Sequence, residues 1–183
     1  CRICKTNYPK INNIARLTGE ENYADSFGFQ WNIFGKTQLD SFIEKSISKD
    51  RLFEVTQWKS DLKGQNILEA GSGAGRFTEV LVKNKANIYS FDYSNAVEAN
   101  YLNNGHNSNL TIFQGDIYKI PFSDDTFDHV LCLGVLQHTP DPRNSFICLS
   151  KKLKKGGYLY IDVYTKSFRH SLQWKYILRP ITK

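Results

Sequence analysis

Short apolar segments of strand length alternate with helical patterns along most of the chain. Apolar runs that favour buried strands occur at residues 66–70, 87–92, 109–114, 127–133 and 157–164. Apolar positions at three- and four-residue spacing predict helices near residues 75–84, 95–103 and 142–153. This alternation predicts an α/β fold with a doubly wound, mostly parallel sheet that is covered on both faces.

The residues before this region have a different pattern. Residues 1–36 are rich in Asn, Gly and aromatic side chains and are predicted to be irregular, and a broken helical pattern follows from Thr37 to Trp58. We therefore expect an N-terminal segment (1–36) and one folded domain (37–183).

The stretch ILEAGSGAGRFTEVL (67–81) reads as a strand, a glycine turn and the start of a helix. Such a turn directs backbone N–H groups and the positive end of a helix towards a bound ligand. A tight connection that needs glycine only for its backbone angles is the alternative. In parallel sheets ligands bind beyond the carboxyl ends of the strands, where this turn lies.

Acidic residues near this turn limit the classes of ligand that it can bind. Asp92 closes the second strand of the region, 17 positions after Gly75, where a carboxylate can accept both hydroxyls of a ribose. Arg76 occupies the last glycine position of a dinucleotide fingerprint, and Glu69 before the turn would repel a pyrophosphate. A nicotinamide-dependent oxidoreductase is therefore disfavoured, and a ligand with a positive amino group is favoured.

Composition indicates an ordinary globular protein. The 183 residues are 40% hydrophobic and 23% charged, and neither a stretch of about 18 apolar residues nor a signal peptide occurs, so we expect a cytoplasmic location. Cys1 and Cys4 have the spacing of half a zinc site, whereas a structural zinc ion takes four ligands, so no metal site is predicted. Cys132 and Cys148 are predicted to be structural.

Four motifs in order resemble those of class I S-adenosylmethionine-dependent methyltransferases: EAGSGAG (69–75), Asp92, GDIYKIPFSDDTFD (115–128) and LKKGGYLYI (153–161). The likeness covers about 66–164 and implies a Rossmann-like, seven-stranded sheet. That family adds two strands after the fifth, whereas SFRHSLQWKYILRPITK offers one helical segment, so we expect a sheet that is incomplete at its C-terminal edge or a C-terminal part that was not retained.

The resemblance implies S-adenosylmethionine as cofactor. Asp92 would hold the ribose, Asp116 the adenine amino group, and Tyr93 and Ile117 would flank the ring. The cofactor-binding residues implied in this way are Glu69, Ala70, Gly71, Gly73, Gly75, Asp92, Tyr93, Asp116, Ile117 and Leu133.

The segment GVLQHTPDP (134–142) resembles the part of these enzymes that faces the transferred methyl group, although Gln137 stands where the family often has histidine. His138 is the candidate general base, or else a loop-ordering residue. The N-terminal segment resembles the second half of a zinc ribbon followed by a lid. Four residues are weak candidates for that lid, with simple aromatic packing as the alternative: Phe29, Gln30, Trp31 and Gln38.

The formal net charge of +6 raises the question of a nucleic-acid partner. Lys151, Lys152, Lys154 and Lys155 lie at a helix end, where solvated cations are common, and no RNA-binding module is recognisable. We therefore expect methyl transfer to a small-molecule, lipid-linked or saccharide acceptor, with a non-catalytic module that binds cofactor or a partner as the alternative. The identity of the acceptor within these classes and the oligomeric state are not predicted.

Overall fold

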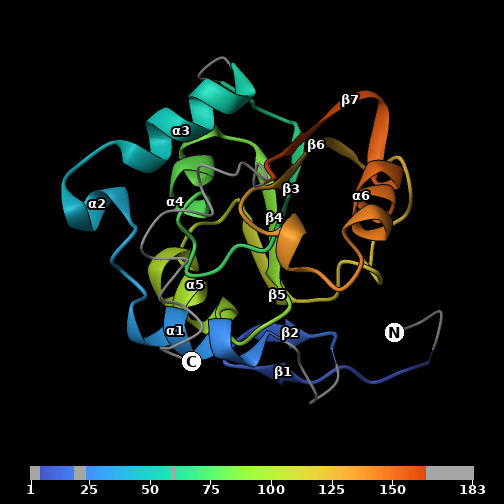
Figure 1. The fold of residues 1–183 in the computed structure, drawn as a ribbon, viewed down its shortest axis with the longest axis horizontal. Helices are drawn as coiled ribbons and strands as arrows, with labels where there is room; N and C mark the ends of the chain where they lie inside the picture. Colours follow the sequence, from blue (N-terminus) through green and yellow to red (C-terminus); the bar gives the residue numbers. More distant parts are fainter. Residues whose placement is uncertain (1–4, 19–23, 59–60, 164–183) are drawn as a thin grey trace, which may run out of the picture.

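The computed structural model describes residues 5–18, 24–58 and 61–163 (Figure 1). The strands are β1 (Lys10–Ile11), β2 (Ile14–Arg16), β3 (Asn66–Ala70), β4 (Asn87–Asp92), β5 (Leu110–Gln114), β6 (Phe127–Cys132) and β7 (Leu153–Ile161). The α-helices are α1 (Asp25–Ile33), α2 (Asp40–Ile43), α3 (Ile47–Thr56), α4 (Thr78–Leu81), α5 (Val97–Asn104) and α6 (Pro142–Lys151). Two 3₁₀ turns are η1 (Val82–Asn84) and η2 (Leu136–His138).

Within these residues the strands form one seven-stranded sheet in the order β1-β2-β5-β4-β3-β6-β7. The β1–β2 pair is antiparallel and the other neighbouring pairs are parallel. Helices α4 and α5 lie on one side of the sheet and α6 on the other (Figure 1). The predicted Rossmann-like, mostly parallel architecture is confirmed.

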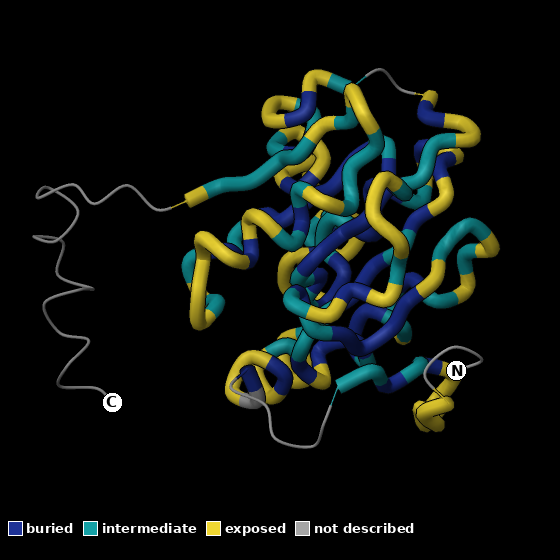
Figure 2. The backbone as a smooth tube through the Cα atoms, turned by 90° about the vertical axis from the view of Figure 1, so that its right-hand side faces the viewer, coloured by how far each residue is buried: buried dark blue, intermediate teal, exposed yellow. Residues whose placement is uncertain are grey.

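Each face of the sheet has its own hydrophobic core. On the α6 side, Leu149 packs with Leu68 and Val130, and on the other side Leu52 and Leu81 pack against further strand residues. The central strands are buried almost throughout, as the dark tube in Figure 2 shows. Two apolar faces explain why these strands read as continuous apolar runs.

The N-terminal segment differs from the prediction of irregular structure, because it contributes β1, β2 and α1. Strand β2 pairs with β5, and Ile14 is fully buried against Val97 and Ile112. Strands of two or three residues are too short to show a period of two, and Gly28 lowers the helix propensity of α1. The boundary after residue 36 stays a prediction, although the sheet itself includes strands from before it.

Three further boundaries differ. The long helical pattern is split, because Glu44 adopts a left-handed conformation (φ 53°) at the end of α2. The first helix after the glycine turn is only α4 plus η1. The last strand begins at Leu153, where a register shift near Phe127 and a glycine at φ 82° (Gly156) obscure the strand pattern. Cys1, Cys4 and the expected C-terminal edge of the sheet lie outside the described residues.

Candidate active site

The glycine turn joins β3 to α4 at the carboxyl end of the sheet. The N–H groups of Gly71 and Ser72 both donate to the carbonyl of Phe91, at 2.8 and 3.0 Å, which ties the turn to β4. Gly71 has a φ of 76°, and a Cβ there would lie 2.3 Å from a methyl carbon of Val135. Glycine is therefore required at this position both for its backbone angle and for close approach to the loop after β6.

Asp92, at the end of β4, is held by the residues around it. Its Oδ2 accepts from the N–H of Gly73 at 2.9 Å, and its Oδ1 accepts from the N–H and the hydroxyl of Ser94 at 2.8 and 2.7 Å. A carboxylate has about four accepting positions, so these three bonds leave one of them for a ligand. The side chain is thus fixed in place and still able to accept.

Glu69 lies in a buried polar cluster beneath the turn. Its Oε2 accepts from the hydroxyls of Thr78 and Ser90 at 2.6 and 2.7 Å, and the amide of Asn100 donates to both hydroxyls. Burial raises the pKa of the Glu69 carboxyl to about 7, against the hydrogen bonds that lower it. Its Oε1 is buried without a hydrogen-bond partner in the structure.

A cavity of about 70 Å³ lies over the ends of β3, β4 and β5. It is lined by Ala24, Phe27, Gly71, Phe91, Asp92, Tyr93, Gly115, Ile117, Val135, His138 and Thr139. The structure thus brings together five residues that the sequence had selected: Gly71, Asp92, Tyr93, Ile117 and His138.

The other predicted residues lie around this cavity rather than on its wall. Gly73 and Gly75 complete the turn, while Ala70 and Leu133 pack in the two hydrophobic cores. Asp116 accepts from the N–H of Tyr118 at 2.9 Å and so orders the segment that carries Ile117.

Helix α1 covers the cavity. The ring of Phe27 lies 5.4 Å from the ring of His138 between centroids, and Gly28 packs directly on the backbone of Asn95. The indole of Trp31 lies 3.3 Å from the position of a Cβ on Gly73. The side-chain amide of Asn103 donates to the carbonyls of Gly35 and Ala74, both at 2.9 Å. These bonds join the segment after α1 to the glycine turn.

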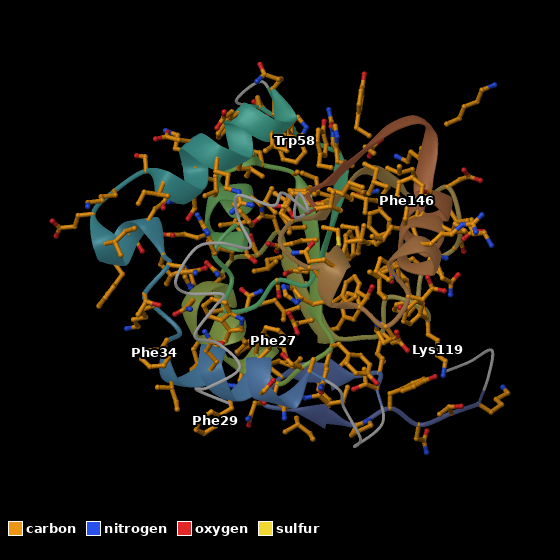
Figure 3. The ribbon with its side chains drawn as sticks, viewed as in Figure 1. Phe27, Phe29, Phe34, Trp58, Lys119 and Phe146 are labelled. Carbon is orange, nitrogen blue, oxygen red and sulfur yellow. The ribbon has the colours of Figure 1, made fainter. Side chains whose placement is uncertain are left out.

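The lid side chains differ in part from those selected by sequence. Figure 3 shows Phe27 on the inner side of α1, whereas Phe29 projects from its outer side and is 72% exposed. Gln30 and Gln38 are exposed as well, so of the four selected residues Trp31 contacts the turn. Helical spacing could have identified the residues that face the cavity and the turn. Ala24, Phe27, Gly28 and Trp31 recur at three- and four-residue intervals and therefore lie on one side of the helix.

Tyr118 connects the adenine-side segment to the loop that carries His138. Its hydroxyl accepts from the N–H of Asp141 at 2.9 Å and from the hydroxyl of Ser145 at 3.0 Å. The hydroxyl of Ser145 also lies 2.9 Å from the hydroxyl of Thr139, and Thr139 lines the cavity. At the other end of the loop, the N–H of Gly134 donates to Asp162. The loop is therefore anchored on both sides of His138.

The chemistry of the lining fits S-adenosylmethionine better than a pyrophosphate cofactor. No Lys or Arg occurs among the described residues that line the cavity, so a pyrophosphate would find no cationic partner. Asp92 offers an acceptor to a ribose, and Ile117 and Tyr93 offer surfaces to a ring. No group of three or more residues able to hold a metal ion occurs in the described part of the chain.

Comparison with known families agrees with this chemistry. A family model described as a methyltransferase domain matches residues 68–161, slightly more than half of the chain. The chain belongs to the class I S-adenosylmethionine-dependent methyltransferases.

Two curated relatives act on different acceptors. A tRNA U34 carboxymethyltransferase of Nautilia profundicola is 30% identical over 134 residues, which cover 72% of this chain and 42% of the relative. A ubiquinone biosynthesis O-methyltransferase of Coxiella burnetii is 29% identical over 110 residues, or 59% of this chain and 47% of the relative. The chain thus spans less than half the length of these methyltransferases.

A solved structure shares the fold. The complex between the Haloferax volcanii Trm112 methyltransferase activator and a methyltransferase contains a chain with a TM-score of 0.64 and 21% identity, covering 86% of this chain and 67% of that one. The described residues of this methyltransferase include no helix long and apolar enough to cross a membrane.

Proposed function

We propose that this methyltransferase transfers a methyl group from S-adenosylmethionine to an O, N or C nucleophile of a small-molecule, lipid-linked or saccharide acceptor. The observation that supports this most is the single cavity wall that contains Gly71, Asp92, Ile117 and His138. These residues come from four separate segments, and each ends or follows a strand at the carboxyl end of the sheet.

In this proposal the turn and the strand ends hold the cofactor. Asp92 accepts a ribose hydroxyl at its one remaining position, while Ser94 and the turn keep its carboxylate in place. Tyr93 and Ile117 flank the adenine ring, and Asp116 accepts from its amino group. Glu69, whose Oε1 is buried without a partner beneath the turn, attracts a cationic amino group nearby when its carboxyl is ionised.

The cofactor supplies an activated sulfonium methyl group, so the protein's main tasks are alignment and exclusion of water. Phe27 and Trp31 of α1 exclude water from the cavity. His138 removes the proton of the acceptor when that proton is held by a weakly acidic hydroxyl. Thr139 and Tyr118 fix the loop in which His138 lies.

The test begins with binding and then measures transfer. Isothermal titration calorimetry should detect S-adenosylhomocysteine binding and no NAD binding. Tighter binding of NAD than of S-adenosylhomocysteine would refute the cofactor assignment. Transfer of label from methyl-labelled cofactor is then measured with phenolic quinone precursors, saccharides and tRNA as acceptors.

The tRNA arm is included because one relative acts on tRNA and the chain carries a net charge of +6. Labelling of tRNA in preference to the other acceptors would overturn the proposed acceptor class and leave the proposed cofactor intact. Cofactor binding without transfer to any class would favour the non-catalytic module instead.

A further inference from the structure

Helix α1 carries large apolar side chains on both of its faces. On the inner side Phe27 lines the cavity and Trp31 lies beside Gly73, whereas the outer side carries Phe29 and Ile33, which are 72% and 56% exposed. A surface helix normally directs one apolar face to the core and a polar face to water. The outer side of α1 departs from this pattern, because Phe29 and Ile33 project there beside the exposed polar residues Ser26 and Gln30.

The exposed apolar residues continue onto neighbouring elements. Phe34 at the end of α1, Phe42 of α2 and Leu102 of α5 are 53%, 60% and 82% exposed. With Phe29 and Ile33 they form what we call the lid patch. A hollow of about 340 Å³ is lined by four of its members, namely Ile33, Phe34, Phe42 and Leu102. Figure 3 shows Phe29 and Phe34 projecting from this edge of the molecule, away from the sheet.

Charge at the lid patch has one sign. Lys36 lies on the wall of the hollow, and no acidic residue lies among the described residues of that wall. Asp40, close by in sequence, is occupied because its carboxylate accepts from the N–H groups of Ser48 and Lys49, both at 2.8 Å.

We infer that the lid patch docks on a lipid bilayer that contains anionic lipid. Projecting aromatic and aliphatic side chains beside a lysine, with no acidic residue on the described wall of the hollow, have the composition of an interfacial membrane-binding surface, and the chain as a whole carries a net charge of +6. The same positive charge disfavours a second copy of the chain as the occupant, since two such surfaces repel. Because α1 carries both patch residues and Phe27 of the cavity wall, docking would place the helix that covers the cavity at the bilayer surface.

This placement selects a lipid-linked acceptor within the proposed function, on which that part of the inference rests. The docking itself is independent of methyl transfer. It can therefore be tested without an acceptor.

Co-sedimentation of the chain with vesicles is the test. Vesicles of phosphatidylcholine alone are compared with vesicles that also contain phosphatidylglycerol, and stronger binding to the latter is expected. Phe34→Ser combined with Leu102→Ser should weaken binding about tenfold or more, since two exposed apolar groups are removed. The matched control is Phe146→Ser with Ile147→Ser on α6, where the two side chains are 43% and 41% exposed. The control should change binding less than about twofold.

S-adenosylhomocysteine binding is measured separately from vesicle binding. It shows whether each double variant is folded and tests the proposed cofactor, and it should be unchanged in both double variants. Absence of vesicle binding by the parent chain, or equal losses in the two double variants, would overturn the inference. So would a parent dimer that dissociates in the patch variant, because the patch would then be a contact between copies.

Discussion

The backbone N–H of Gly73 donates to Oδ2 of Asp92 at 2.9 Å, so the glycine turn and the carboxylate after β4 fix each other. The same carboxylate also accepts twice from Ser94. Asp92 therefore has a structural role as well as its proposed role as the ribose acceptor. Substitutions at this position are expected to affect both the turn and the ligand.

Asp92→Ala should weaken S-adenosylhomocysteine binding by about 1.5–3 kcal/mol, the range for hydrogen bonds to a charged group. Calorimetry measures the loss, and thermal unfolding measures the stability lost with the three internal bonds. Asp128→Ala is the matched control, since Asp128 accepts from the N–H of Asn66 at 2.8 Å near the start of β6. That control should lower stability and leave cofactor affinity unchanged. An Asp92→Ala variant with parental affinity would refute the ribose assignment.

Gly71→Ala tests close approach in the turn. A Cβ at Gly71 would meet Val135 at 2.3 Å, so the turn or the loop after β6 must move. We expect at least a tenfold loss of S-adenosylhomocysteine affinity, or about 1.4 kcal/mol. Gly64→Ala is the control, because Gly64 has nearly the same φ (78°) and a Cβ there would have no neighbour within 4 Å. It should cost about 1 kcal/mol of stability and no affinity. Equal effects of the two substitutions would show that backbone strain alone explains the glycine.

The central part of the fold was predictable from sequence because its strands have two buried faces. Segments such as NILEA at β3 and NIYSFD at β4 are short apolar runs, and the structure confirms both with their predicted bounds. The short β1–β2 pair has no such signal. Its place depends on contacts with β5 and α5, which lie about a hundred residues later in the chain.

The site residues that could be predicted from sequence are those whose residue type is needed for a particular backbone geometry or a particular hydrogen bond. Gly71 and Asp92 were selected by their positions after two strands, and both line the cavity. Phe27 and Val135 were missed because an aromatic or aliphatic residue is compatible with many environments. Their assignment requires knowing that α1 folds back over the glycine turn, which only the tertiary arrangement reveals.

Cofactor binding should displace α1. The cavity of about 70 Å³ is smaller than the roughly 300 Å³ at which ligand pockets begin, so Phe27 on its wall must move to admit a nucleoside, and a shift of α1 would carry Trp31 with it. We expect S-adenosylhomocysteine to change the tryptophan fluorescence of the chain. Trp31→Phe should abolish this change, whereas Trp58→Phe should preserve it, because Trp58 packs on His129 and Tyr160 away from the cavity. A change that survives Trp31→Phe would contradict the displacement.

Glu69 should make stability depend on pH. Burial raises the pKa of its carboxyl from 4.5 to about 7, so the folded state favours the neutral form. The stability that the protonated Glu69 carboxyl gives to the folded state is fully present below the pKa of the unfolded state, and it is lost as the pH rises from about 4.5 to about 7. Glu69→Gln keeps a neutral side chain at every pH. Its free energy of unfolding relative to the parent should therefore rise over this interval, by an amount on the order of 3 kcal/mol.

Chemical denaturation across pH measures this difference. Glu54→Gln, at an exposed position on α3, is the control and should leave the pH profile unchanged. Parallel profiles for Glu69→Gln and the parent would show that the carboxyl has the same pKa in the folded and unfolded states, contrary to the expected effect of burial.

His138→Ala distinguishes catalysis by a base from catalysis by alignment. The imidazole borders the cavity and contacts the ring of Phe27, while Tyr118, Thr139 and Ser145 anchor the loop independently of it. The substitution should therefore leave S-adenosylhomocysteine affinity nearly unchanged. If the acceptor group is a weakly acidic hydroxyl, turnover should fall about 10²–10⁴-fold, the usual contribution of a positioned base. His106→Ala, at an exposed histidine after α5, is the matched control and should retain turnover.

Turnover is measured across pH, since loss of a base should also remove the corresponding limb of the rate profile and raising the pH should partly restore the rate. A variant that loses turnover and cofactor affinity together would make His138 a loop-ordering residue, because removal of a base has no reason to weaken binding of a product that carries no transferable methyl group.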